Sequence, residues 1–190
     1  MIARTRRLMS FILLLLACLA FACNGNEIEK ANQLVEAGNA SVKEGQKLQE
    51  AATSKKDRLF DTISPEQYPA ERDSVKGLAQ EAADGFEKSA AKYREAAAKF
   101  DQASKLKIHE KLKEYLALKA QEFNKRAEQA DINRGTPKAF MESDDAVALH
   151  KTMIDNKDRA DKLEKEAGEL AEKSDKIKQE NKDIFKPDPK

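Results

Sequence analysis

The chain has 190 residues, and its 35 lysines and arginines nearly balance its 34 acidic residues, which gives a net charge of +1. Lysine and glutamate alternate along the chain, which argues against nucleic-acid binding, because such proteins gather basic residues on one face. Alanine, glutamate, lysine and leucine dominate, and tryptophan is absent. This composition is typical of long helices or a coiled coil. The core should be thin, because few large side chains are available.

The first 22 residues form a leader that differs from the rest of the chain. Three arginines precede an apolar run from Leu8 to Phe21, in which Ser10 is the only polar residue. This run is shorter than the roughly 20 residues that a membrane-spanning helix needs. A basic start, a short apolar stretch and a final small residue, Ala22, are typical of a secretory signal peptide. We therefore expect residues 1–22 to be a signal peptide; the alternative is a buried N-terminal helix.

The end of the leader carries a family resemblance. Ala22 followed by Cys23 resembles the last two positions of the signal of bacterial lipoproteins. The resemblance implies cleavage between Ala22 and Cys23, and acyl chains such as palmitate attached through the Cys23 thiol. By the same resemblance, Asn24 implies an outer-membrane location facing the periplasm. The resemblance covers only the leader and implies nothing about the activity of the mature domain.

The cysteine count agrees with a lipid anchor. Cys18 and Cys23 are the two cysteines of the chain, so the chain after Cys23 has no internal disulfide. A lipid on Cys23 accounts for this single thiol. Two alternatives stay open. Cys18 is a second candidate for lipidation, and ordinary secretory cleavage after Ala22 would release a soluble periplasmic or secreted protein.

Residues 23–26 are expected to be a lipidated tether, and residues 27–185 a single elongated helical domain. The first helix is expected at about residues 27–63, because apolar and small residues recur on one face with the three-four spacing of a heptad. They are Ile28, Ala31, Val35, Gly38, Val42, Gly45, Ala52 and Leu59. We interpret Gly38 and Gly45 as sites where a neighbouring helix approaches closely; the alternative is two tolerated weak points.

Two turns are expected to separate the helical segments. Two prolines within residues 64–69 predict the first, where Ser64 and Gln67 have the spacing of a capping box. A glycine and a proline within residues 133–137 predict the second, because glycine commonly follows a helix end and proline breaks a helix.

The segment between these turns, about residues 70–132, is expected to be helical. Its buried face includes Phe86, Tyr93 and Phe100, an aromatic ladder at seven-residue spacing that we interpret as core packing. The heptad register slips at residues 104–107. The slip indicates either a stutter within one continuous helix or a break that would give four helices in all.

The last helix is expected at about residues 144–184, with Ser143 as its N-cap. Its heptad positions are Ala146, Leu149, Met153, Asn156, Ala160, Leu163, Ala167, Leu170, Ser174 and Ile177. Asn156 is the polar residue that we expect to fix register or pairing, because a single asparagine in a seam commonly does so. Residues 186–190 are expected to be a frayed tail.

The predicted fold class is therefore all-α: an elongated, antiparallel three-helix bundle, or a four-helix bundle if the middle segment breaks. In the three-helix arrangement, the first and last helices pack along opposite halves of the longer middle segment. They would overlap only near its centre, which would give a rod that is thickest in its middle.

No catalytic or metal-ligating pattern stands out in the chain. His109 and His150 are the only histidines, and neither has the spacing of a metal-ligand pair, so we interpret both as surface or boundary residues. We expect no enzymatic activity, no cofactor and no metal. The predicted function is that of a lipid-anchored envelope spacer or protein-interaction module with an envelope protein partner. The alternatives are a periplasmic holdase or assembly factor, and a homo-oligomer.

Overall fold

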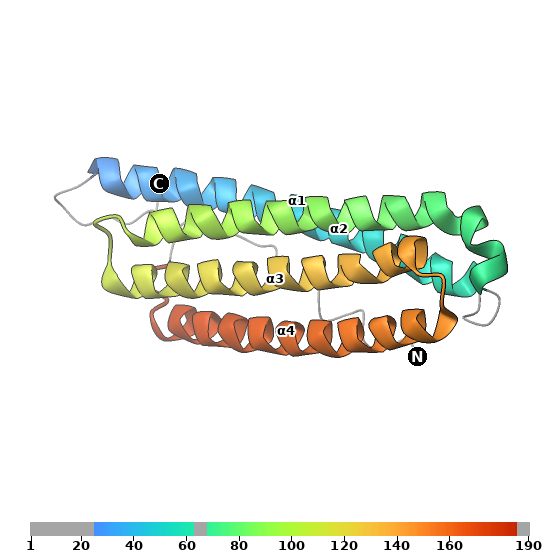
Figure 1. The fold of residues 1–190 in the computed structure, drawn as a ribbon. Coiled ribbons are helices and arrows are strands. Elements are labelled where there is room, and N and C mark those ends of the chain that lie inside the picture. Colours follow the sequence, from blue (N-terminus) through green and yellow to red (C-terminus); the bar gives the residue numbers. More distant parts are fainter. Residues whose placement is uncertain (1–24, 63–67, 186–190) are drawn as a thin grey trace.

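The computed structural model describes residues 25–62 and 68–185, and within them the fold is all-α, as predicted. Four helices pack against each other: α1 (Gly25–Thr62), α2 (Tyr68–Ser104), α3 (Glu110–Glu142) and α4 (Ala146–Glu180). Figure 1 shows them as an elongated antiparallel bundle. The leader with Cys18, Ala22 and Cys23, the turn at residues 63–67 and the tail at 186–190 lie outside the described residues.

The middle segment is not one helix, so the four-helix alternative is correct and the three-helix one is wrong. The chain leaves α2 after Ser104 and enters α3 at Glu110, at the register slip in the sequence. The loop keeps Ile108 buried, at 9% exposure, so an apolar residue continues the core across the reversal. His109 caps α3, because its Nδ1 accepts a hydrogen bond from the backbone N–H of Lys111 at 3.2 Å.

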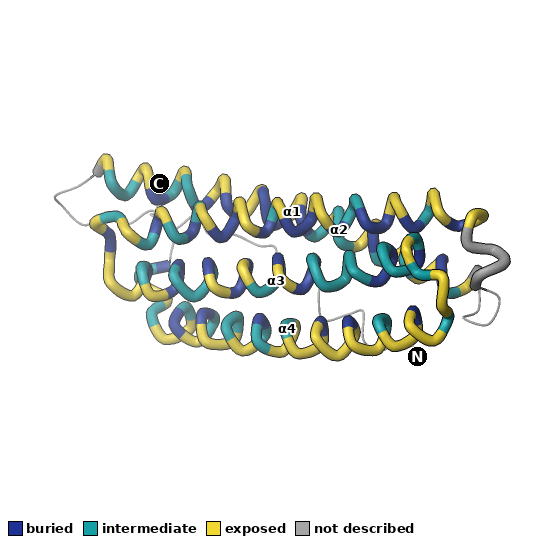
Figure 2. The backbone as a smooth tube through the Cα atoms, viewed as in Figure 1, coloured by how far each residue is buried: buried dark blue, intermediate teal, exposed yellow. Residues whose placement is uncertain are grey.

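This reversal changes how the outer helices pack. Extensive contacts join α1 to α2, α2 to α3 and α3 to α4, whereas α1 and α3 share only a small contact. Because α2 folds back onto α3, the helices run side by side over most of their length (Figures 1 and 2). The predicted rod, in which the outer helices overlap only near the centre, is therefore replaced by a shorter and thicker bundle.

The second predicted turn, at residues 133–137, is also wrong. Helix α3 continues through Gly135 and Pro137 to Glu142. Proline removes one backbone hydrogen bond from a helix interior, but Pro137 is almost fully buried here, so packing offsets the loss. At Gly135, an added Cβ would lie 2.8 Å from Nδ2 of Asn156. The glycine lets α4 approach α3 closely instead of ending the helix.

The chain instead turns between α3 and α4 at residues 143–145. Ser143 is the C-cap of α3, and its N–H donates to the carbonyl of Ala139 at 3.0 Å. Asp145 is the N-cap of α4, and its carboxylate accepts from the N–H of Val147 at 2.9 Å. The prediction of Ser143 as the N-cap was therefore wrong by two residues, because Asp145 supplies a stronger, charged acceptor at the helix start.

The core consists of two clusters, one towards each end of the bundle. The larger lies where α1 begins and includes Tyr93, Phe100, Leu116 and Phe123; the smaller includes Leu59, Phe140 and Leu149 at the other end. Phe86, Tyr93 and Phe100 are all buried, at 0%, 2% and 3% exposure. The rings of Tyr93 and Phe100 lie 6.0 and 5.7 Å from the ring of Phe123 on α3.

Close approach of α1 and α2 explains the glycines of α1 and confirms that interpretation. A Cβ at Gly38 would lie 2.9 Å from the ring of Phe100, and one at Gly45 would lie 3.0 Å from the ring of Tyr93. The hydroxyl of Ser89 also donates to the carbonyl of Gly45 at 2.8 Å. Two aromatic residues of α2 therefore occupy the space that side chains at these two positions would need.

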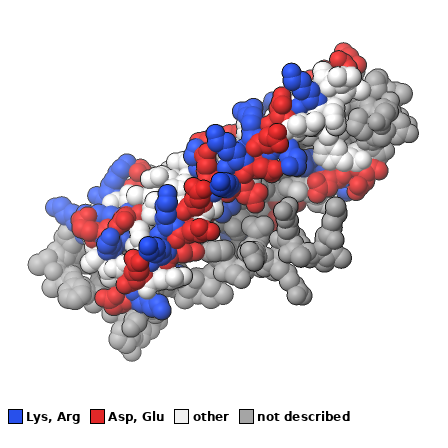
Figure 3. Space-filling view, turned by 90° about the horizontal axis from the view of Figure 1, so that it is seen from below, with Lys and Arg blue, Asp and Glu red and all other residues white. Residues whose placement is uncertain are grey.

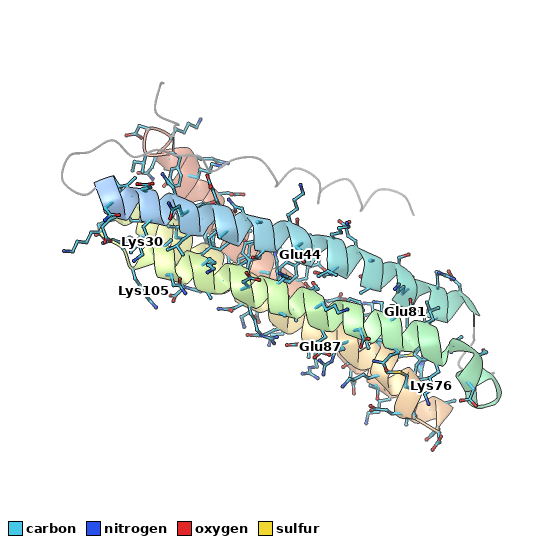
Figure 4. All side chains as sticks on the ribbon, turned by 90° about the horizontal axis from the view of Figure 1, so that it is seen from above. Lys30, Glu44, Lys76, Glu81, Glu87 and Lys105 are labelled. Carbon is cyan, nitrogen blue, oxygen red and sulfur yellow. The ribbon has the colours of Figure 1, made fainter. Side chains whose placement is uncertain are left out.

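Ion pairs between neighbouring helices line the outside of the bundle. Glu44 and Glu81 pair with Lys92 and Lys55 across α1 and α2, at 2.9 and 2.7 Å. Glu87 pairs with Arg134 across α2 and α3 at 3.1 Å. Figure 4 labels these three glutamates on the side of the bundle where α1 and α2 lie. Exposed pairs of this kind are weak and are screened by salt, so the packing of the core carries most of the stability.

Replacing Gly85 with alanine is expected to lower the free energy of unfolding by up to about 2 kcal/mol, because overpacking a tight contact costs about 1–3 kcal/mol and helix propensity offsets about 1 kcal/mol of this cost. The added Cβ would lie 2.8 Å from Cβ of Ala52, which moves only with the backbone of α1. Gly77→Ala is the matched control. Its Cβ would meet nothing within 4 Å, so it should stabilise the protein by about 1 kcal/mol through helix propensity. Urea unfolding of both variants measures the difference, and equal stabilisation would contradict the tight contact.

Candidate functional site

A groove of about 430 Å³ runs between α1 and α4, above one face of α3. The residues that line it come from all three helices. They are Thr53, Lys56 and Phe60 of α1, Gln129, Asn133 and Thr136 of α3, and His150, Met153, Ile154, Lys157, Ala160, Asp161 and Glu164 of α4. The groove exists because both α1 and α4 are flanking helices, each packed mainly against its own neighbour in the chain.

The shape of the groove follows the helix axes. On α4, the lining residues recur every three or four positions from His150 to Glu164. At a rise of 1.5 Å per residue, this stretch is about 21 Å long. The lining residues of α1 and α3 have the same spacing, so each helix contributes one stripe. The groove is therefore a trough with parallel helical walls and a length of about four helical turns.

The walls of the groove carry a few apolar side chains among polar and charged ones, and its floor is polar. Met153 and Phe60 are half-buried, and Ile154 is 46% exposed, although it is a large apolar side chain. On the floor, Gln129 and Thr136 are 8% and 7% exposed. The amide of Gln129 donates to the backbone carbonyl of Ala160 at 3.4 Å, a long hydrogen bond. An occupant could therefore bury apolar surface on the walls and form hydrogen bonds with the floor.

The polar floor belongs to a longer polar seam on α3. Glu122, Gln129 and Thr136 follow one another at intervals of seven residues, and all three are buried. Glu122 is 3% exposed and lies between Lys119 and Arg126, which it meets at 2.9 Å each. A heptad position that is apolar in an ordinary bundle core is thus polar from Glu122 to Thr136.

The flank of the groove formed by α4 is charged with both signs. Lys157 pairs with Asp161 at 2.7 Å on the groove side of α4, and Lys125 of α3 pairs with Glu166 at 3.0 Å outside the groove, on the other side of α4. Figure 3 shows blue and red side chains interleaved on the face seen from below, without a large region of one sign among the described residues. This pattern is that of a solvated helix face.

Two tyrosines of the core should ionise only when the protein unfolds. Burial raises the pKa of Tyr93 to about 12, and burial also raises the pKa of Tyr115. Because the folded pKa lies above the unfolded value of about 10, the stabilisation is fully present below pH 10 and is lost as the pH rises towards 12.

We therefore expect alkaline unfolding at pH values between about 10 and 12, in which phenolate absorbance and loss of helical circular dichroism rise together. Tyr93→Phe is the control, because it removes one of the two core phenols among the three tyrosines of the chain and also the hydrogen bond that the Tyr93 hydroxyl donates to Gln49 at 2.8 Å. Ionisation of both tyrosines near pH 10 in a fully helical protein would contradict this expectation.

The residues singled out in the sequence do not meet in the groove. Phe86, Tyr93 and Phe100 belong to the packing of α2. Asn156 lies buried between α4 and α3, where its Nδ2 has no hydrogen-bond partner among the described residues. The groove and the polar seam were missed. The seam had a signal in the sequence, the seven-residue spacing of polar residues that begins at Glu122, whereas the groove had none.

The two histidines are exposed and lie at opposite ends of the bundle, His109 before α3 and His150 near the start of α4. Within residues 25–62 and 68–185, no three His, Asp or Glu side chains come together in a group that could hold a metal ion. In the same ranges, each helix is too short or too polar to cross a bilayer.

Comparison with models of protein families finds no match, and no curated protein or solved structure matches the chain.

Proposed function

We propose that the protein is a lipid-anchored, non-enzymatic module of the bacterial cell envelope that holds a partner protein at a distance from the membrane. The leader and Cys23 support the anchor, and Asn24 favours the outer membrane facing the periplasm. The observation that carries the interaction role is the open groove between α1 and α4. It is a helix-shaped trough with an exposed isoleucine on its wall.

The position of the groove supports a spacer role. Cys23 precedes α1 by two residues, so the anchored end of the bundle is the end where α1 begins. The first groove residue on α1, Thr53, lies 28 residues beyond Gly25. This distance corresponds to about 42 Å along the helix. A partner in the groove would therefore be held in the half of the bundle away from the membrane.

The occupant that the groove fits is an amphipathic helix of an envelope protein. Its apolar stripe would cover Ile154 and Met153, and its polar side chains would pair with Gln129 and Thr136 on the floor. Lys56 on the α1 wall favours an acidic residue on the flank of the helix that faces α1. This arrangement corresponds to recognition of a helix in a groove.

Site-specific photo-crosslinking in intact cells tests the groove. A photoreactive residue at position 154 should form an adduct with one envelope protein, through a helical segment of that protein. The same residue at position 88, an exposed site on α2, is the control. Ile154→Asp should abolish co-purification of this partner, because the groove wall becomes charged. Identical adducts from both positions would refute the groove as the binding site.

The anchor needs a separate test. The intact mass of the protein from the membrane fraction should correspond to a chain that starts at Cys23 and carries acyl groups. A Cys23→Ser variant should stay unprocessed or leave the membrane. An unmodified mass in the soluble fraction would mean ordinary export and would remove the spacer role.

The second predicted function is that of a holdase. The crosslinking experiment at position 154 distinguishes a holdase from a module with one partner. Adducts at position 154 with many unfolded envelope proteins would support a holdase and would contradict a single partner. Among the described residues, the exposed large hydrophobic side chains are Val147 and Ile154, both on the N-terminal half of α4. Such a small apolar surface favours one specific helix. Adducts of the protein with itself would indicate a homo-oligomer.

A further inference from the structure

We infer that the end of the bundle where α1 begins rests against the membrane surface, and that the α2–α3 loop at residues 105–109 makes the contact with lipid headgroups. The inference rests on the proposed attachment at Cys23. It adds a second contact between protein and membrane, which fixes the orientation of the bundle relative to the membrane. It also assigns that contact to particular residues.

Covalent geometry places the anchor beside this end. Consecutive Cα atoms are 3.8 Å apart, so the Cα of Cys23 lies within about 8 Å of the Cα of Gly25, the first residue of α1. Lipid attached to Cys23 therefore keeps the first turn of α1 close to the headgroups. Every other element at this end of the bundle is brought to the membrane with it.

The α2–α3 loop is held at the same end. The backbone N–H of Lys107 donates to Oε2 of Glu27, in the first turn of α1, at 3.3 Å. Figure 4 shows Lys30 of α1 and Lys105 next to each other at this end of the molecule. The C-terminal turn after α4 lies there as well, because the ring of Phe185 packs 5.1 Å from the ring of Tyr115 near the start of α3.

The loop has the chemistry of a membrane-surface contact. Its sequence is Lys105, Leu106, Lys107, Ile108 and His109, with two exposed lysines around a half-buried leucine and no acidic residue. The loop at the opposite end, residues 143–145, has a serine and two aspartates instead. Lysines near a membrane are attracted to anionic headgroups, and a leucine between them can enter the interface. Aspartates at the far end would be repelled.

The acidic groups next to the loop are already engaged. The carboxylate of Glu27 accepts the hydrogen bond from the loop backbone, Asp101 pairs with Nζ of Lys105 at 2.6 Å, and Glu110, the residue after the loop, pairs with Nζ of Lys113 at 2.7 Å. Because Asp101 neutralises Lys105, the attraction to headgroups rests mainly on the exposed Lys107. The electrostatic attraction acts over about 8 Å at physiological ionic strength. This range is similar to the distance of about 8 Å between the Cα atoms of Cys23 and Gly25. The loop therefore lies close enough to the membrane for the attraction to act. Groups at the far end of the bundle lie several such lengths away.

A chemical anchor tests the inference without relying on lipidation in the cell. The chain from Cys23 onward retains both core clusters, and Cys23 is its single cysteine. It can be coupled through this thiol to a maleimide lipid in vesicles that contain phosphatidylglycerol. Because the chain has no tryptophan, Leu106→Trp and Val147→Trp each give one fluorescent reporter, and brominated lipids quench a tryptophan that touches the bilayer.

We expect strong quenching at position 106 and almost none at position 147, at the far end. His109→Trp is a second reporter in the same loop, so a packing defect caused by Leu106→Trp would not decide the result. In phosphatidylcholine vesicles, or with Lys105→Gln and Lys107→Gln, quenching at the loop should fall several-fold. Equal quenching at positions 106 and 147 would show that the long axis of the bundle lies parallel to the membrane. No quenching at positions 106 and 109 would show that the loop does not touch the membrane. Either result overturns the inference.

The two tests fail independently. If the mass experiment shows no acyl group, the proposed function loses its anchor, whereas the vesicle experiment still reports on the affinity of this loop for headgroups. If the vesicles show no contact at the loop, a lipoprotein with a freely tilting bundle remains, and the proposed function is unaffected.

Discussion

Phe86→Ala is expected to lower the free energy of unfolding by about 3–5 kcal/mol, the usual cost of removing a fully buried phenylalanine. The Phe86 side chain is 0% exposed and lies on α2 between the residues of the two core clusters. The buried positions around it on α2 are Ala82, Ala83 and Ala90. Alanines have no side-chain torsion with which to fill the cavity, so the loss should be near the upper end of the range.

Ile154→Ala is the matched control, because it removes a large apolar side chain that is 46% exposed. Its effect should stay within about 0.5 kcal/mol, as is usual for surface substitutions. Urea unfolding followed by circular dichroism measures both variants. Equal effects of the two substitutions would mean that Phe86 does not join the two halves of the core.

Glu122→Gln should cost about 3 kcal/mol, because removing one member of a buried ion cluster leaves the remaining charges without compensation. Oε2 of Glu122 meets Nζ of Lys119, and Oε1 meets the guanidinium of Arg126, each at 2.9 Å. The side chains of these two cations are only 13% and 24% exposed. Without the carboxylate, two positive charges would face each other within the polar seam.

A triple variant with Met, Leu and Met in place of Lys119, Glu122 and Arg126 separates the cost of an unpaired charge from the value of the cluster. It should be close to the parent protein in stability, because apolar groups of similar size can replace a buried ion cluster. Asp101→Asn, which breaks an exposed pair with Lys105, should have little effect. If Glu122→Gln lowers the free energy of unfolding as little as Asp101→Asn does, water effectively solvates the cluster.

The sequence predicted the helices whose apolar residues follow one clear period. The heptads of α1 and the aromatic ladder of α2 predicted both their helical form and their buried faces. The slip after Ala103 marked the place where α2 ends, but the pattern alone did not distinguish a stutter from a reversal. The outcome depends on which arrangement has the lower free energy: α2 and α3 packed against each other, or one continuous helix.

The failures in α3 have a different cause. Gly135 and Pro137 are strong local signals for a turn, yet contacts with α4 keep both residues inside the helix. Local preferences amount to about 1–3 kcal/mol at these residues, and tertiary packing overrides them. The groove was beyond prediction for a similar reason. Its existence depends on the separation of α1 and α4, which are far apart in sequence.

The dominance of contacts between helices adjacent in the chain has a consequence for folding. Most residues that touch in the native bundle lie within one helical hairpin of each other, so loop closure costs little entropy at most steps. Such a topology has a low contact order, and proteins of this kind fold in microseconds to milliseconds. Each new helix can pack on the one synthesised before it, and the bundle can assemble in order from α1 to α4 without waiting for the end of the chain.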